Sequence, residues 1–292
     1  MNGNCCVRSG ASMPEETLNI AVFGESNVGK SHYGAQLIAR LNAETGSMRM
    51  RGAAPDLAAF DDVVQSLNGG VPGAHTAAGT YTETLLPVLT EDNLAIDLNW
   101  PDYAGEQVSQ LLEERRIPAS WQQRVETADG WILMVRPERA PLAEDIFSRP
   151  LGDLKSSRPD GAVIERSPQA RLVELLQMLL YSTHVRTGKA KPALAVVLSC
   201  WDELQVPEGT TPEQVLGQNL PLLAAFVRNN WDERRTLVLG LSATGVALSK
   251  DSPNKDFIYK GAEQMGWVVT TDGTHTPDLT APISQLAKAL QN

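Results

Sequence analysis

The sequence predicts an α/β fold in which a mainly parallel sheet is covered by helices on both faces. Its aliphatic runs Leu18–Gly24, Trp131–Val135, Ala193–Ser199 and Thr236–Leu241 are short and rich in β-branched residues. Such runs are typical of strands that are buried on both faces. Between them lie longer segments with helical periodicity, and strands that alternate with helices build parallel sheets.

The N-terminal half predicts a strand followed by a helix, and then a hairpin. Leu18–Gly24 is the first strand, and Lys30–Asn42 follows with the spacing of apolar residues that a helix requires. The other elements predicted here are a short helix at Leu57–Leu67, a hairpin of Thr82–Leu89 with Asn93–Asn99, and a helix at Gly105–Arg116 that Pro118 ends.

The C-terminal half continues the alternation after an irregular stretch that reaches Ser167. Pro168–Thr187 predicts a strong helix, because leucines recur along one of its faces. Thr211 and Pro212 are typical of a helix start, and one helix is expected from there towards Trp231. The last elements predicted are a hairpin of Trp267–Thr271 with Thr274–Thr276 around Asp272-Gly273, and a closing helix at Ala281–Leu290.

The composition fits a globular protein and argues against nucleic acid as a partner. Hydrophobic residues make up 42% of the 292 residues and charged residues 21%, while the net charge is −10. Non-specific binding to nucleic acid or anionic membrane needs a basic face, so neither is expected. The cysteines Cys5, Cys6 and Cys200 fit neither a disulfide framework nor a zinc site. With no apolar run of about 18 residues and no signal peptide, the chain is expected to be cytoplasmic, without a transmembrane segment.

The chain shows no internal repeat and no low-complexity linker, which favours a single domain. We expect residues 1–16 to form a disordered tail and residues 17–292 to form the domain. Within it, residues 138–166 read as an insert rich in Pro, Arg, Asp and Ser, and residues 254–292 as a C-terminal hairpin plus helix.

The stretch GESNVGKS, residues 24–31, matches the phosphate-loop pattern G-x-x-x-x-G-K-[ST] between a buried strand and a helix. Backbone N–H groups of such a loop bind the β-phosphate, and the helix N-terminus adds a positive end. Lys30, expected to be exposed, would reach the β- and γ-phosphates, and Ser31 would bind Mg²⁺. The nucleotide-binding residues predicted here are Gly24, Glu25, Ser26, Asn27, Val28, Gly29, Lys30, Ser31 and His32. The pattern alone indicates only a nucleoside triphosphate, and for His32 packing is preferred over a catalytic role.

Three short segments that follow predicted strands favour guanine over adenine. Asp102 and Gly105 form a D-x-x-G pattern in which the carboxylate would hold Mg²⁺ through water and the Gly105 N–H would sense the γ-phosphate. Asp202 could accept hydrogen bonds from guanine N1–H and N2–H₂, which adenine does not offer. Ser242 and Ala243 come after the last core strand, where a backbone N–H can meet guanine O6. Each segment is expected at the carboxyl edge of the sheet, where ligands bind in doubly wound folds.

These segments resemble the motifs of TRAFAC-class small P-loop GTPases, the group with a Ras-like core. GESNVGKS is similar to their first motif and DYAGEQ to their DxAGQE form; SCWDEL stands where N-K-x-D is expected, and LSATG is similar to their S-A motif. Within the class, WDEL and the tail GWVVTTDGTHTPDLTAPI resemble bacterial double-GTPase proteins. The resemblance implies a doubly wound, six-stranded sheet with one antiparallel strand. It also implies Mg²⁺–GTP as the ligand and two switch loops ordered by GTP.

The resemblance also implies roles for individual residues. Lys30, Gly105, Glu106 and Gln107 are the catalytic candidates, although Glu106 stands where Ras-like proteins have a water-orienting Gln. Ser31, Thr80 and Asp102 are the metal candidates, with Thr82 second to Thr80 as the switch threonine. Asn27 stands where cation-activated members hold K⁺, so K⁺ is a further candidate cofactor.

Two departures weaken the match, and two alternatives remain open. Ser199 and Cys200 replace the family's Asn and Lys, so weaker guanine affinity is expected, and Glu106 at the glutamine position predicts slow turnover. Cys200 is a candidate for thiol modification. Arg136 could contact a phosphate, but a solvated loop residue is the preferred interpretation. The preferred function is a GTP-hydrolysing switch that binds GTP and GDP and works with a protein effector or activating protein. The alternatives are a nucleotide-binding interaction module with little hydrolysis, and a P-loop ATPase or kinase.

Overall fold

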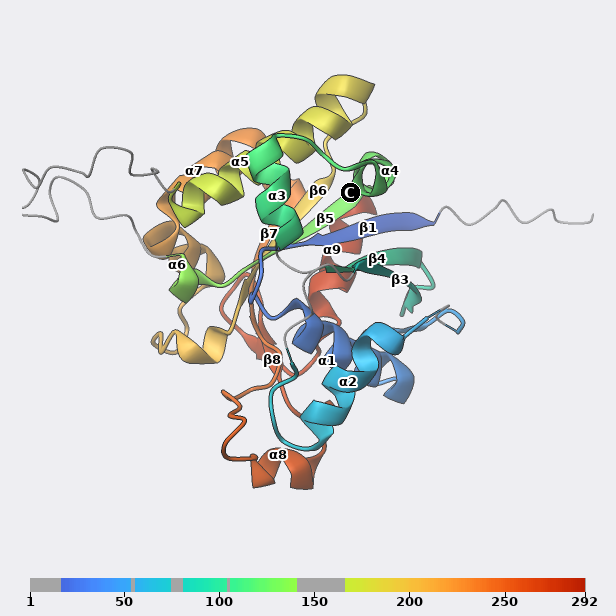
Figure 1. The fold of residues 1–292 in the computed structure, drawn as a ribbon, viewed down its shortest axis with the longest axis vertical. Coiled ribbons are helices and arrows are strands. Elements are labelled where there is room, and N and C mark those ends of the chain that lie inside the picture. Colours follow the sequence, from blue (N-terminus) through green and yellow to red (C-terminus); the bar gives the residue numbers. More distant parts are fainter. Residues whose placement is uncertain (1–16, 54–55, 75–80, 104–105, 141–165, 292) are drawn as a thin grey trace, which may run out of the picture.

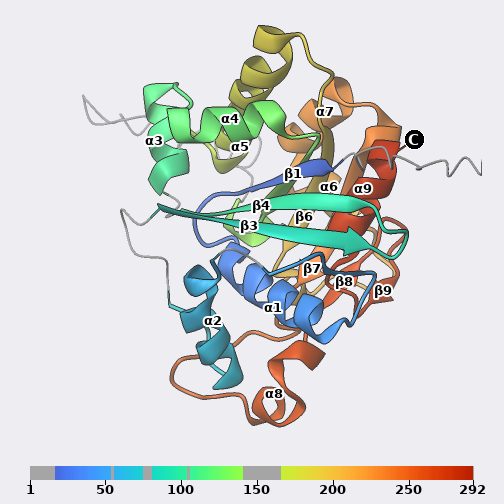
Figure 2. The same cartoon turned by 90° about the vertical axis from the view of Figure 1, so that its right-hand side faces the viewer.

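The computed structural model describes residues 17–53, 56–74, 81–103, 106–140 and 166–291. The described strands form one sheet (Figures 1 and 2). Their spatial order is β2 (Met48–Met50), β3 (Tyr81–Thr90), β4 (Ala95–Tyr103), β1 (Leu18–Phe23), β5 (Gly130–Val135), β6 (Ala193–Ser199), β7 (Thr236–Ser242), β8 (Trp267–Val269) and β9 (His275–Thr276).

The six central strands, β3 to β7 in spatial order, confirm the predicted sheet. Strands β4, β1, β5, β6 and β7 are parallel, and β3 runs antiparallel to β4. The sheet has nine strands rather than six, because β2 adds to β3 at one edge and the β8–β9 hairpin adds to β7 at the other. The hairpin was predicted, whereas β2 has only three residues and gave no signal in the sequence.

Helices cover both faces of the sheet, as predicted. They are α1 (Lys30–Ala43), α2 (Ala58–Asn68), α3 (Glu106–Glu114), α4 (Ala119–Thr127), α5 (Pro168–Leu180), α6 (Pro212–Asn219), α7 (Pro221–Asn230), α8 (Lys255–Lys260) and α9 (Ala281–Gln291). Figure 2 shows α3 and α4 on one side of the sheet and α1 and α2 on the other.

Strand β1 shows how the two faces are divided. Its side chains alternate, so Ile20 and Val22 enter the core shared with α1, α2 and α9, while Ala21 and Phe23 enter the core under α3 to α7. All four are almost fully buried. A strand covered on both sides has no polar face, which is why β1 is apolar at every position except Asn19.

Two predicted helices differ in the structure, and one helix was not predicted. The helix expected from Pro212 towards Trp231 is two helices, α6 and α7, that meet at Leu220. Pro221 causes the break, since proline has no N–H to donate and its ring clashes with the preceding turn. The chain after Pro118 forms α4, because Pro118 precedes a helix as well as ending one. The predicted helix Pro168–Thr187 leaves α geometry at Tyr181 for a π turn over Tyr181–Val185.

The C-terminal segment is anchored to α1 by buried polar groups of that helix. The Tyr33 hydroxyl donates to the Leu279 carbonyl at 2.9 Å, and Arg40 donates to the carbonyls of Glu263 and Met265. Helix α8, which was not predicted, packs beside α2 in this region (Figure 1). No helix in the described part of the chain has both the length and the apolar composition to cross a membrane.

Candidate functional site

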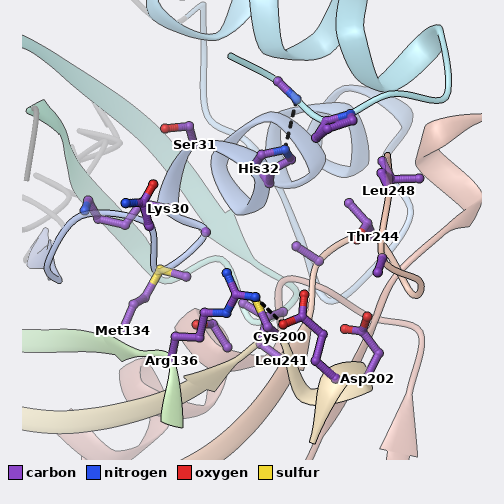
Figure 3. Close-up of a pocket in the computed structure, with 18 of the residues that line it drawn as sticks. Lys30, Ser31, His32, Met134, Arg136, Cys200, Asp202, Leu241, Thr244 and Leu248 are labelled. Carbon is purple, nitrogen blue, oxygen red and sulfur yellow. Dashed lines mark hydrogen bonds and ion pairs between the residues drawn. The ribbon is translucent and has the colours of Figure 1, made fainter. Parts of the chain in front are cut away.

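The candidate site lies at the carboxyl edge of the parallel strands, where β1, β5, β6 and β7 end together. The parallel register aligns these ends, for example by pairing Phe23 with Leu133 and Ser199 with Leu241. A cavity of about 380 Å³ opens at this edge (Figure 3). Ligands of doubly wound folds bind outside this edge.

The phosphate loop after β1 has the backbone that its sequence predicts. Gly29, at the start of α1, has φ 81°, a conformation that glycine adopts without strain. Asn27 also has a positive φ, of 61°, which asparagine tolerates better than most residues. A Cβ on Gly24 would lie 2.8 Å from the Met134 carbonyl oxygen, so only glycine lets β1 pass β5 here.

The Lys30 side chain turns back into the loop. Its Nζ donates to the carbonyl oxygens of Gly24 at 2.9 Å and Glu25 at 2.7 Å. Lys30 is 7% exposed, so the expectation that it is exposed is wrong. The two carbonyls fix the ammonium group inside the loop, where it is shielded from water.

Most of the predicted phosphate-loop residues line the cavity. They are Ser26, Asn27, Gly29, Lys30, Ser31 and His32. The His32 Nε2 accepts a hydrogen bond from the Gly73 backbone N–H at 3.0 Å, which draws the segment after α2 to the cavity. Pro72, Gly73 and Ala74 line this side, and the sequence gave no sign of that.

The opposite wall carries the residues predicted to select the base. Asp202 and Ala243 line the cavity, and Ser242 lies directly behind Asp202. The fully buried Ser242 hydroxyl donates to Asp202 Oδ1 at 2.5 Å and accepts from the Gly245 N–H at 2.9 Å. Two bonds with fixed directions hold the Ser242 oxygen, and Ser242 in turn orients the Asp202 carboxylate.

The two departures from the family pattern have defined surroundings. The buried Ser199 hydroxyl donates to the Val135 carbonyl at 3.1 Å, so it joins the ends of β6 and β5. Cys200 has a left-handed backbone, with φ 55°, and lines the cavity. Burial raises the pKa of its thiol to about 11, against a smaller opposite effect of Arg136. A raised pKa makes the thiolate scarce near neutral pH, which argues against ready modification of Cys200.

Arg136 is a cavity residue, although the sequence favoured a solvated loop residue over a phosphate contact. It follows β5 and lies beside Cys200 in the cavity (Figure 3). Its guanidinium forms ion pairs with Glu203 and, at 3.4 Å, with Glu138. Its side chain is only 18% exposed, so the interpretation as a solvated loop residue is wrong. Burial raises the pKa of Glu203 and a hydrogen bond with Glu138 raises it further, whereas Arg136 opposes both effects.

A second arginine ties the phosphate loop to the helices of the other layer. Arg171 of α5 contacts Glu25 at 2.8 Å through Nε and the Ser109 hydroxyl of α3 at 2.9 Å through Nη2. Glu25 therefore faces α5 rather than the cavity. No sequence motif could have found this contact, because the partners are 146 and 62 residues apart.

The D-x-x-G segment is described in part. Asp102 lies near the end of β4, where it pairs with Thr82 of β3, and β4 runs parallel beside β1. Glu106 is the first residue of α3, and Gln107 follows it and is half-buried. Gly105 and the predicted switch threonine Thr80 lie outside the described residues, as does most of the predicted insert.

The sheet order, the phosphate loop and the oriented carboxylate define a small P-loop GTPase. The model of the family Double-GTPase 1 matches residues 21–286. The chain therefore belongs to the Double-GTPase 1 family, as the resemblance predicted.

Comparison with solved structures finds small GTPases and translation factors at low identity. The small GTPase Arl6 (BBS3) from Trypanosoma brucei, with the bound nucleotide analogue GppNp, is similar over 94% of this chain and 98% of its own, at 10% identity and a TM-score of 0.43. The bacterial selenocysteine-specific elongation factor EF-Sec is similar over 78% of this chain but 26% of its own, at 14% identity and a TM-score of 0.36. Neither score is high enough to support an inference about this chain. No curated protein matches the sequence.

Proposed function

We propose that this chain binds GTP and GDP in the cavity at the carboxyl edge of the sheet and hydrolyses GTP as a molecular switch. One observation carries the proposal: a single cavity joins Lys30 on the phosphate loop to Asp202, whose carboxylate is oriented by Ser242. We expect the phosphates to lie beside the Lys30 ammonium group and the edge of the purine to meet the Asp202 carboxylate. Membership of the Double-GTPase 1 family supports guanine over adenine.

Guanine recognition is tested by competition between nucleotides. GTP should displace a fluorescent GDP analogue at far lower concentration than ATP. Asp202→Asn should weaken GTP by about 2–4 kcal/mol, because an amide cannot accept from both N1–H and N2–H₂. The same variant should bind xanthosine triphosphate better than the wild type does, since xanthine offers an acceptor at that edge. Equal competition by ATP and GTP in the wild type would rule out guanine selectivity.

Mg²⁺ is the metal that the donor set suits. Ser31 lines the cavity beside Lys30, and its hydroxyl is a hard oxygen ligand of the kind Mg²⁺ prefers. Asp102 is the proposed ligand through water and Thr80 the proposed switch ligand. When bound, Mg²⁺ would neutralise charge on the β- and γ-phosphates.

K⁺ is a second candidate cation, at Asn27. This residue lines the cavity from a left-handed backbone. A monovalent cation there would stabilise negative charge that develops during hydrolysis. Hydrolysis should then be several-fold faster in K⁺ than in Na⁺ at equal ionic strength, and Asn27→Ala should lose the difference. Equal rates in K⁺, Na⁺ and Cs⁺ would remove the K⁺ site.

The hydrolytic step is proposed to use Glu106 or Gln107 to orient water, with Gly105 at the γ-phosphate. The half-buried Gln107 at the start of α3 is consistent with this role. Glu106 in place of glutamine favours slow turnover and keeps the second function open, an interaction module that changes shape with its nucleotide. Single-turnover hydrolysis of GTP, with and without an effector or activating protein, separates the two. ATP turnover or phosphoryl transfer to a small acceptor would indicate an ATPase or kinase instead.

A further inference from the structure

The cavity wall next to Asp202 carries a second charged group, and ion pairs hold it in place. Arg136 rises from the end of β5 into the cavity beside Cys200 (Figure 3). Its Nη2 is paired with Glu203, the residue that directly follows Asp202. The base-selecting carboxylate and the guanidinium are thus linked through two adjacent residues of one short turn, Trp201–Glu203.

Several features distinguish the ion pair of Arg136 and Glu203 from an ordinary surface ion pair. The side chain of Arg136 is 18% exposed and that of Glu203 is 25% exposed, so both are largely removed from water. The Arg136 Nε–H is buried and has no hydrogen-bond acceptor among the described residues, a cost that stability alone does not explain. The neighbouring Cys200 thiol is neutral near neutral pH, so it does not compete for the guanidinium.

The following inference rests on the proposed function. We propose that Arg136 binds the nucleoside and that its planar guanidinium packs on the face of the purine. Asp202 would select the edge of the same purine. A guanidinium is flat, stacks on aromatic faces and is more weakly hydrated than an ammonium. The ion pair with Glu203 fixes the plane before the ligand arrives, which reduces the entropy lost on binding. Arg136 therefore supplies affinity for any purine, while Asp202 supplies the choice of guanine.

Because the two residues are assigned different roles, the proposal can be tested by titrating full-length variants with GTP, GDP and ITP. Arg136→Gln should weaken all three nucleotides by the same factor, about 5- to 30-fold. Asp202→Asn should instead change the ratio of GTP to ITP, because ITP lacks the N2 amino group. Arg228→Gln is the matched control: it removes an exposed arginine that pairs with Glu213 and should change no affinity.

Loss of the guanidinium also leaves Glu203 unneutralised, and that charge alone would repel phosphates. The double variant Arg136→Gln/Glu203→Gln removes both charges and so keeps the local net charge of the wild type. It should retain most of the affinity loss if contact with the base is the cause. Arg136→Lys, which keeps the charge but not the plane, should also bind all three nucleotides more weakly, and it remains informative should Arg136→Gln not fold.

Three results would overturn the inference. One is wild-type affinity in the charge-balanced double variant, and another is wild-type affinity in Arg136→Lys. The third is a loss that grows from GDP to GTP in the double variant, which would assign Arg136 to the phosphates. If wild-type protein binds no guanine nucleotide, the proposed function itself fails, and that outcome is read from the wild-type titration alone.

Discussion

Removal of the Ser242 hydroxyl tests the base-selecting wall most directly. Ser242 is fully buried, and its oxygen takes part in two hydrogen bonds, to Asp202 at 2.5 Å and from the Gly245 N–H at 2.9 Å. Ser242→Ala leaves the Asp202 carboxylate without its orienting donor and the Gly245 amide without its acceptor. The backbone of β7 stays as it is, because alanine fits wherever serine does.

The magnitude follows from the two bonds. A hydrogen bond to a charged group contributes about 1.5–3 kcal/mol, and this loss should appear in GTP binding as a Kd raised by roughly 10- to 150-fold. The Gly245 amide is only partly buried, so leaving it unsatisfied costs up to about 1–3 kcal/mol, and this loss should appear in the free energy of unfolding. The GTP-to-ITP affinity ratio should fall as well, since a freely rotating carboxylate no longer holds both guanine donors.

Calorimetric titration with GTP and ITP, beside thermal unfolding without nucleotide, measures both effects. Ser284→Ala is the matched control, because Ser284 is also buried and its hydroxyl bonds Ser47 and the Ala281 carbonyl, away from the cavity. It should lower stability and leave nucleotide affinity unchanged. If Ser242→Ala loses stability like the control but keeps wild-type affinity and selectivity for GTP, Asp202 does not recognise the base.

Three further outcomes are expected. Lys30→Met should abolish nucleotide binding, measured by fluorescence titration, while the circular dichroism spectrum stays native. The reason is that methionine replaces the buried aliphatic stem of Lys30 but not its ammonium group. Submicromolar GTP binding by the folded variant would refute the phosphate-loop assignment. Cys200, with a pKa raised by burial to about 11, should resist iodoacetamide at pH 7.5 and react only as the pH rises above about 9. Alkylation is measured by mass spectrometry. If Cys200 were alkylated at neutral pH as fast as Cys5, its thiol would not be shielded as the raised pKa implies. Tyr33→Phe should lower the free energy of unfolding by about 1–2 kcal/mol, because the buried Leu279 carbonyl loses its donor. Tyr259→Phe is the control and should have no effect, because Tyr259 is 92% exposed. Equal melting temperatures for the two variants would show that the hydrogen bond of Tyr33 contributes nothing to stability.

Local features of the chain were predictable from the sequence because their causes are local. Strand β1 is apolar at every position except Asn19 since both of its faces are covered, and a seven-residue window is enough to show this. The phosphate loop is likewise specified within eight residues, by Gly29, which has a positive φ, and by Gly24, which has no room for a Cβ. Pro221 shows the limit even of local signals: the sequence displayed the helix-breaking residue, but the apolar periodicity around it favoured one helix over two.

The wall of the cavity depended on tertiary structure, for a physical reason. Asp202 and Ser242 could be placed at one edge in advance, because parallel strands align their carboxyl ends. Whether an arginine after β5 would enter that edge or remain in water could not be deduced, since its partner Glu203 lies 67 residues further along the chain. Ion pairs and burial of this kind arise from the packing of distant segments, so they leave no periodicity or motif in the sequence around either partner. The sequence by itself therefore determined the class of ligand and the edge of the sheet at which it is expected, whereas the tertiary structure decided which buried charges surround that edge.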